Sequence, residues 1–454
     1  MSLKIYYKIL YCTLVALMAF TEVSQAQEPT AQQRYNDLKN ITFSEEAGKG
    51  ERYPEIELTD NSSLSDYLAY AAHHNPELEA AFNRWKAALE KIPQVHSLPD
   101  PLFTYTYFIE NVETRVGPQR HKFDISQTFP WFGKLNLLGD VALEEANIRK
   151  QAYEMLKLEL FYKVKEVYYE YYYLSRSMYV TEDNLKLLSY FESVAQTNYT
   201  TGKAPLADVI KAQVELGKLE ERLLSLRDLR EPVAAKLNAV LNRQSDAQLP
   251  WPSSLQVKDI TLTDDEILQL IVEKNPDLKA LEFKIEKEVK SRELAKKQFY
   301  PNIMLGLSYV ETGPSSMPGT ADSGKDPIMT MLSVNLPLWR NKYHAAVRES
   351  EILRKTAVND RENRENILRA DLKSALYKYR DAGRKKELYR DTLIPKAKQA
   401  LNVTQTAFES GTKDFLSLIE AQRTLLEFEL SYEWALTNRE KFRAQVEMLV
   451  GRDF

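Results

Sequence analysis

Four short stretches of the chain alternate between hydrophobic and polar residues, which is the pattern of β-strands with one apolar face. We predict strands at about 102–110, 121–129, 302–310 and 328–336. In the first stretch, for example, Phe103, Tyr105 and Tyr107 fall on one face and threonines fall on the other. Each stretch has about nine residues, which is long enough to cross a bilayer when the strand is tilted.

Two much longer segments have a helical pattern and contain almost no helix breakers. One runs from Lys134 to about residue 199, turns near Gly202 and returns over 206–242. The other runs over 340–409, with Pro395 as its one interruption, turns near Gly411 and returns over 415–450. The leucines between 216 and 237 have the spacing of a coiled-coil seam. These segments predict two long helical hairpins, 134–242 and 340–450.

The two halves of the sequence resemble one another. Asn75-Pro76 recurs 200 residues later as Asn275-Pro276, and Gln213 recurs 209 residues later as Gln422. Pro101 likewise recurs as Pro301. An ordered series of such matches indicates a duplicated structural unit. We therefore divide the chain into a first repeat, 64–250, and a second repeat, 251–454.

The N-terminus has the pattern of a secretory signal peptide, which we assign to 1–26. Lys4 and Lys8 precede a short apolar run, and Ser24-Gln25-Ala26 offers small residues for cleavage. Residues 27–63 are polar and predict an extended arm with little regular structure. Cys12 is the only cysteine, so we expect no lipid anchor, no disulfide and no thiolate metal site in the mature chain.

Composition and motifs argue against nucleic-acid binding and against catalysis. The net charge is only -4, although 28% of the residues are charged. The chain therefore lacks the excess of lysine and arginine that is typical of nucleic-acid binding. Phosphate-loop, zinc-protease and nucleophile-elbow motifs are absent from the sequence. The five histidines are scattered, and Met304, Met329 and Met331 suit packing or lumen lining better than metal binding. We expect no enzyme, no cofactor and no metal site.

The ends of the predicted strands suggest a membrane location. Pro101, Pro130, Pro301 and Pro337 mark the same end of all four strands, and polar loops at 111–120 and 311–326 mark the other. Beyond the prolines stand Trp131, Phe132 and Trp339, and aromatic residues of this kind favour a membrane–water interface. Four strands cannot close a barrel, whose known minimum is about eight. Because open edges are not tolerated in lipid, we expect three chains to supply twelve strands.

These features together resemble the TolC-type outer-membrane efflux family. The shared motifs are the duplicated Asn-Pro-x-Leu starts, the run Gln127-Thr128-Phe129-Pro130-Trp131-Phe132-Gly133-Lys134, Tyr300-Pro301-Asn302, Leu336-Pro337-Leu338-Trp339, and the turn motifs from Gly202 to Gln213 and from Gly411 to Gln422. The resemblance covers nearly the whole mature chain, and the Phe-Pro-Trp-Phe-Gly-Lys form is similar to the heavy-metal branch.

The resemblance implies an α+β fold in which a trimer forms a membrane β-barrel, with four strands per chain and twelve in total. This barrel would continue into a long periplasmic α-helical coiled-coil barrel. The resemblance also implies docking to a periplasmic adaptor (membrane fusion) protein and an inner-membrane pump. It implies a location in the outer membrane of a Gram-negative bacterium, with outer-membrane lipid around the strands and the helices in the periplasm.

The resemblance also assigns candidate sites. The hairpin tips that would contact the adaptor carry Gly202, Lys203, Gly411, Thr412 and Lys413. Positions that form acidic pore rings in the family correspond to Ser417 and Glu420, where the serine departs from the acidic pattern. Asp208 occupies the matching place in the first half and is the candidate for the missing carboxylate. The alternative is that Asp208 and Glu420 are ordinary solvated helix residues.

We therefore expect a passive export duct of a tripartite efflux system, carrying heavy-metal cations or small toxic compounds. An outlet for type I protein secretion is the alternative within the same architecture. A soluble periplasmic coiled-coil scaffold is the alternative from a different class.

Overall fold

The computed structural model describes residues 29–48, 58–59, 62–252, 255, 257–410 and 412–453, so the predicted signal peptide lies outside the described residues. The chain divides into two compact units. We call 1–40, 89–143 and 297–338 the sheet unit, and 41–88, 144–296 and 339–454 the helical unit. None of the helices that the structure describes has an 18-residue stretch apolar enough to cross a membrane.

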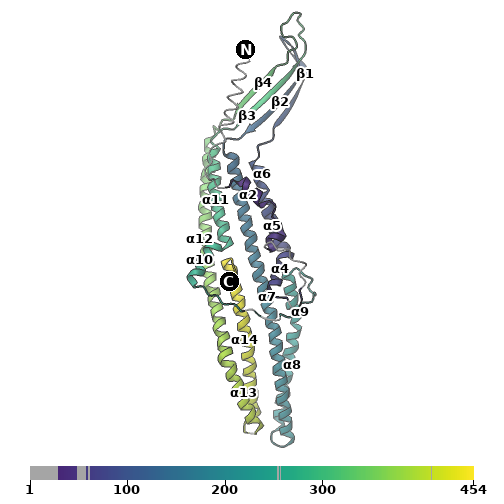
Figure 1. Ribbon diagram of the computed structural model, residues 1–454, viewed down its shortest axis with the longest axis vertical. Helices are drawn as coiled ribbons and strands as arrows, with labels where there is room; N and C mark the ends of the chain where they lie inside the picture. Colours follow the sequence, from purple (N-terminus) through teal and green to yellow (C-terminus); the bar gives the residue numbers. More distant parts are fainter. Residues whose placement is uncertain are drawn as a thin grey trace. The chain divides into compact units, whose positions relative to one another are not determined.

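The sheet unit contains a four-stranded antiparallel sheet, as the alternating patterns predict (Figure 1). Its strands follow one another in chain order, so that β1 and β4 are the two edges. The bounds are β1 (Leu102–Thr114), β2 (Gly117–Phe129), β3 (Ile303–Thr312) and β4 (Ile328–Val334). Two short helices, α2 (Ala31–Leu38) and α6 (Lys91–His96), belong to the same unit.

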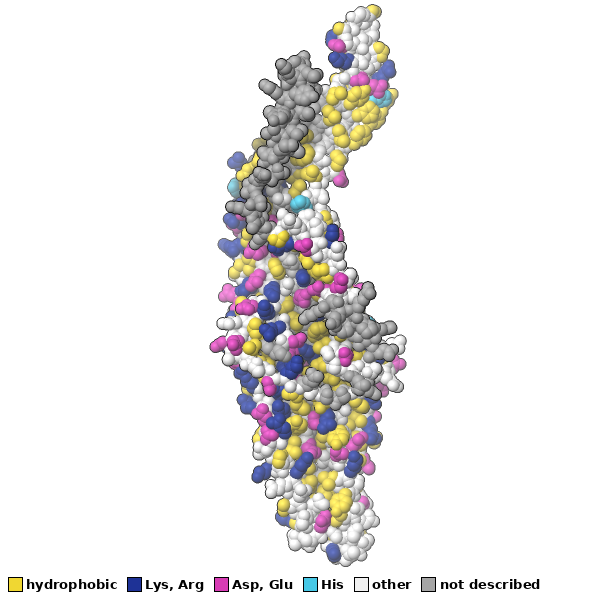
Figure 2. Space-filling view, in the orientation of Figure 1, with side chains coloured by type: hydrophobic (Ala, Val, Ile, Leu, Met, Phe, Trp, Pro, Cys, Tyr) yellow, Lys and Arg dark blue, Asp and Glu magenta, His cyan; other side chains and the backbone are white. Residues whose placement is uncertain are grey.

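The register of the sheet gathers the apolar residues on one face. Phe123 pairs with Tyr309, Ile125 with Leu307, and Leu305 with Leu332, and directly opposite residues share a face. Figure 2 shows hydrophobic side chains concentrated over the strands. The opposite face carries threonines, serines, the methionines at 304, 329 and 331, and an ion pair in which Lys122 Nζ lies 2.9 Å from Asp124 Oδ1. The sheet therefore has one face suited to lipid and one suited to water.

The first hairpin is longer than its local pattern predicts. β1 and β2 extend through the expected 111–120 loop, and only Arg115 and Val116 form the turn. The β3–β4 loop supplies the reason, because its backbone N–H groups at Gly313 and Gly324 donate to carbonyls at this turn at 2.8 and 2.7 Å. Gly117 permits the approach: its φ is +131°, and a Cβ there would lie 1.8 Å from the Gly313 carbonyl oxygen.

The N-terminal arm differs from the prediction of little regular structure. It contains α2 and, in the helical unit, α3 (Phe43–Gly48). Thr30 and Gln33 bond reciprocally at the start of α2, and Thr42 and Glu45 do so at the start of α3. Each pair is a capping box, which satisfies two backbone N–H groups of a helix start. These caps stabilise helices that a reading based on hydrophobic periodicity misses.

The helical unit consists of long antiparallel helices with shorter ones packed on them (Figure 1). The bounds of its remaining elements are α4 (Leu64–His74), α5 (Pro76–Leu89), α7 (Lys134–Thr200), α8 (Leu206–Asp228), α9 (Arg230–Val240), α10 (Asp264–Lys274), α11 (Pro276–Lys297), α12 (Arg340–Leu388), η1 (Tyr389–Leu393), α13 (Ile394–Glu409) and α14 (Phe415–Val450).

The expected returning helix 206–242 is divided at Leu229. Pro395 cannot donate a backbone hydrogen bond, and the helix widens into the π-helical turn η1 just before it.

The two Asn-Pro motifs act alike, as the repeat predicts. The side-chain oxygen of Asn75 accepts from the Leu78 N–H at 2.8 Å, and that of Asn275 accepts from the Leu278 N–H at 3.2 Å. Both asparagines therefore cap the helix that the following proline begins.

A polar seam joins α7 to α14. Along it, Lys165 bonds Glu447 at 2.6 Å and Arg176 bonds Glu433 at 2.9 Å. Further along the same two helices, Gln422 donates to Asn184 at 3.1 Å. A second group of charges in the seam centres on Glu440, which accepts from Arg439 and from Arg443. Apolar clusters flank the seam, so these charges are held inside the helical unit.

Candidate functional site

The first hairpin tip joins α7 to α8. α7 ends at Thr200, and Gly202 takes a φ of +72°, a conformation that glycine adopts without strain. The N–H groups of Lys203 and Ala204 then donate to the carbonyl of Asn198 at 2.7 and 3.2 Å. This turn leaves Lys203 exposed at the end of the hairpin.

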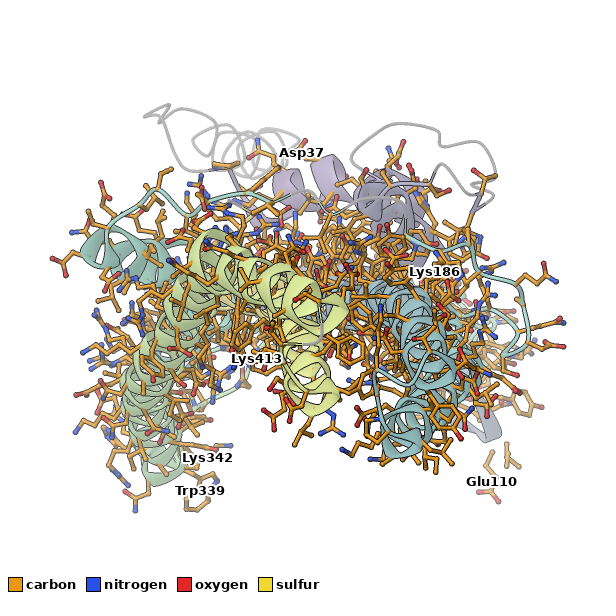
Figure 3. The ribbon with its side chains drawn as sticks, turned by 90° about the horizontal axis from the view of Figure 1, so that it is seen from below. Asp37, Glu110, Lys186, Trp339, Lys342 and Lys413 are labelled. Atoms are coloured by element: carbon orange, nitrogen blue, oxygen red, sulfur yellow. The ribbon has the colours of Figure 1, made fainter. Side chains whose placement is uncertain are left out.

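The second hairpin tip, between α13 and α14, repeats that geometry 209 residues later. The N–H groups of Thr412 and Lys413 donate to the carbonyl of Ala407 at 2.8 and 3.2 Å. Gly411, the counterpart of Gly202, lies outside the described residues. Thr412 and Lys413 are exposed, and Figure 3 labels Lys413 beside this helix pair. The described residues of the two tips thus share these backbone hydrogen bonds and differ in their side chains.

The three candidate pore residues have different surroundings. Asp208 is in the first turn of α8, is only 8% exposed, and lies 3.4 Å from the ammonium group of Lys211. Ser417 is half-buried in the first turn of α14. Glu420 is exposed on α14, one turn further along. Of the two candidate carboxylates, only that of Glu420 is open to solvent in a single chain.

Asp414 is a carboxylate that the sequence analysis did not single out. It precedes α14 and accepts hydrogen bonds from Ser417, 3.2 Å from the backbone nitrogen and 2.5 Å from the hydroxyl oxygen. These bonds hold the pKa of Asp414 below its usual range, because they favour the ionised form. The sequence pattern that could have predicted this cap is an aspartate three residues before a serine at a helix start. The serine at 417 therefore fixes a neighbouring carboxylate and carries no charge itself.

The second candidate region lies within the sheet unit, at the end of β2 and just before β3, and we call it the junction. The ring of Trp131 stacks on Tyr300, with centroids 5.2 Å apart, and packs against Phe132 at 5.7 Å. Phe132 is exposed. Trp339, the third predicted interface residue, precedes α12 and is 77% exposed. Figure 3 labels it near Lys342, in the first turn of that helix.

Asn302 connects the parts of this junction. Its side-chain oxygen accepts from the Trp131 N–H at 3.3 Å and from the Lys134 ammonium group at 2.9 Å. Its own N–H donates to Asn335, which follows β4. Three segments that are far apart in the sequence thus meet at one asparagine. The sequence analysis noted Asn302 only as part of a motif. Its hydrogen bonds could not be predicted, because its partners are up to 171 residues away.

Within the part of the chain that the structure describes, no group of three or more His, Cys, Asp or Glu side chains is placed to hold a metal ion.

Comparison with known proteins identifies the family. Residues 68–243 and 267–452 match the sequence profile of the outer membrane efflux protein family. Outer membrane protein OprJ of Pseudomonas aeruginosa is 25% identical over 317 residues, which are 68% of this chain and 64% of OprJ. The chain spans about three fifths of the length of such curated relatives, 59% and 64% in two cases.

Solved structures of outer membrane channels share the fold. VceC of Vibrio cholerae superposes with a TM-score of 0.67 and 16% identity, covering 86% of this chain and 96% of VceC. The open state of MtrE of Neisseria gonorrhoeae gives 0.66 and 16%, covering 95% of this chain and 98% of MtrE. The profile matches this chain in two blocks, one in each half, and the internal repeat stays a prediction. The chain belongs to the outer membrane efflux protein family, which places it in the outer membrane with its helices in the periplasm.

Proposed function

We propose that the protein is a passive outer-membrane export duct of a tripartite efflux system. The observation that carries the proposal is the sheet, which has an apolar face, a polar face and two unpaired edges, β1 and β4. In lipid, the N–H and C=O groups of an edge strand must pair with another strand. A polar inner face suits a water-filled channel. The family match supports the same conclusion.

The edges argue for a trimer. A single chain offers four strands, whereas membrane barrels of single chains have at least about eight. Pairing β4 of one copy with β1 of the next satisfies both edges and repeats around a symmetry axis. Three copies supply twelve strands, and the helical hairpins of the same three copies would form the periplasmic tunnel.

The assembly is tested by purification in detergent, followed by mass measurement and single-channel recording. We expect a trimer that forms a channel of large conductance in planar bilayers, whether the channel is constantly open or gated. A monodisperse monomer without conductance contradicts the duct. Recovery from the periplasm without detergent would instead favour the alternative of a soluble coiled-coil scaffold.

The exposed tip residues support docking to a periplasmic adaptor, which would connect the duct to an inner-membrane pump. Lys203, Thr412 and Lys413 offer cationic and hydroxyl groups at the ends of the two hairpins. The cargo we propose is heavy-metal cations or small toxic compounds, with type I protein secretion as the alternative. Membership of the heavy-metal branch stays a prediction, and the sensitivity of a deletion strain to metal salts and to drugs tests it.

Glu420 is the better candidate for a selective carboxylate ring. In a trimer it would contribute three like charges, which attract cations, if its exposed side faces the axis. We expect Glu420→Gln to lower the cation preference in single-channel recordings and to leave trimer yield nearly unchanged, since exposed charges stabilise little. Asp208→Asn serves as the comparison, because its carboxylate is buried beside Lys211 and should affect selectivity less. Unchanged selectivity in Glu420→Gln would remove Glu420 from the pore.

A further inference from the structure

Two lysine ammonium groups lie at the junction of the sheet unit without a carboxylate partner. Lys134 is buried, and its ammonium donates to the Tyr300 carbonyl at 3.0 Å and to Asn302 at 2.9 Å, both neutral acceptors. Lys297 holds its ammonium 3.8 Å from where a Cβ on Gly133 would stand and 5.9 Å from the centre of the Tyr300 ring. Among the described residues, neither ammonium has a carboxylate oxygen within 4.0 Å.

Two further features show that the positive charge of the junction has no anionic partner in the part of the chain that the structure describes. Burial lowers the pKa of Lys134, because no nearby anion offsets the loss of hydration. The backbone N–H of Lys134, the first residue of α7, donates to the Trp131 carbonyl at 3.0 Å, and the helix dipole adds partial positive charge at this end of the helix. The neighbouring Lys296 differs, since it bonds Glu293 at 2.7 Å. An anion is therefore what the junction lacks.

Along the chain, the residues of the apolar face are followed closely by the two lysines. Phe129 and Ile303 form the last pair between β2 and β3, and both belong to the apolar face. Immediately beyond them come the stacked rings of Trp131 and Tyr300 and the exposed ring of Phe132. Tryptophan and tyrosine favour the level of lipid headgroups. The order along the chain is hydrocarbon-facing residues, then aromatic rings, then ammonium groups.

We propose that this junction binds the headgroup of an anionic phospholipid of the periplasmic leaflet, with the phosphate between Lys297 and the start of α7. The acyl chains of that lipid lie along the apolar face beside Phe129 and Ile303. The inference rests on the proposed function, because it requires the sheet to be embedded in the outer membrane. It adds a lipid partner of defined charge and the residues that select it.

Native mass spectrometry of the detergent-purified trimer tests the site with phosphatidylglycerol and phosphatidylcholine as probes. We expect phosphatidylglycerol to be retained in preference to phosphatidylcholine. Lys297→Gln should weaken phosphatidylglycerol retention about fivefold, the effect expected for one lysine beside an anionic lipid. Lys297→Arg should restore it, because the positive charge remains.

Lys284→Gln is the matched control. Lys284 stands on the same helix, α11, but its ammonium bonds Asp360 at 3.0 Å, so this change should leave lipid retention unaltered. Equal retention of the two lipids by the intact trimer overturns the lipid site while leaving the duct standing. An equal loss in Lys284→Gln and Lys297→Gln also overturns it. Failure of the unmodified protein to form a trimer contradicts the duct itself.

Discussion

Replacing Leu305 with arginine is expected to cost about 2–4 kcal/mol of membrane-inserted stability, the penalty for arginine near the bilayer midplane on a lipid-facing strand. Leu305 is on the apolar face of β3, is 50% exposed, and pairs with Gln127 and Leu332 on the neighbouring strands. Folding of the purified protein into lipid vesicles under a urea titration measures the loss.

Met329→Arg is the control for Leu305→Arg. Met329 is on β4, is 45% exposed, and belongs to the opposite face of the sheet. Arginine there should face water inside the barrel and cost much less. Ser308 is a poor choice for the same comparison, because it is buried and donates to Asp124. A larger loss in Met329→Arg than in Leu305→Arg would show that the lipid face has been assigned the wrong way round.

Glu440→Ala is expected to destabilise the helical unit by about 3–5 kcal/mol, because removing one member of a buried ion pair leaves charge without compensation. Glu440 is 0% exposed and accepts from both Arg439 and Arg443. Arg443 would keep its bond to Glu447 at 2.7 Å and Arg439 its bond to Asp259, but each of these two buried guanidinium groups would lose one carboxylate partner. The midpoint of guanidinium unfolding, followed by the loss of helical circular dichroism, measures the change.

Asp381→Ala provides the comparison for Glu440→Ala. Asp381 also bonds two cationic side chains, Lys385 and Arg384, but it does so at the surface of α12. Solvent screens such pairs, so its removal should change the midpoint little. Similar midpoints for the two variants would mean that the charges in the polar seam are hydrated in solution.

Local patterns were sufficient to predict the strands and the long helices. The alternation at 303–309 marks β3, and the lack of breakers after Lys134 marks α7. They were not sufficient for the length of the first hairpin. At its tip, a loop from the second half of the chain bonds Val116 and Pro118, and the local pattern contains no sign of this contact. The capping pairs Thr30–Gln33 and Thr42–Glu45 were readable in the sequence, and their helices were nevertheless missed.

The candidate sites depended more strongly on contacts across the chain. A carboxylate in the first turn of a helix resembles a solvated residue in the sequence, yet Asp208 is buried. Its neighbours Val209 and Ala212 belong to an apolar cluster with residues of α13 and α14, far along the chain, which periodicity does not place. Likewise, nothing near Lys134 in the sequence announces its bond to Asn302, 168 residues away. The turn at Gly202 was identifiable because a turn with positive φ depends on its immediate neighbours, whereas the membrane-interface role of Trp131 and Trp339 stays a prediction.

The matching backbone of the two hairpin tips has a consequence for stoichiometry. Under the docking that we propose, a chain with two such turns offers two docking places, so the proposed trimer offers six at its periplasmic end. They fall into two classes, because one returning helix follows Pro205 and the other follows Asp414. A partner that recognises only the backbone turn can bind at all six places. A partner that contacts the Asp414 carboxylate can bind at three. The valency of binding, and with it the avidity, is therefore set by which of these features the partner contacts.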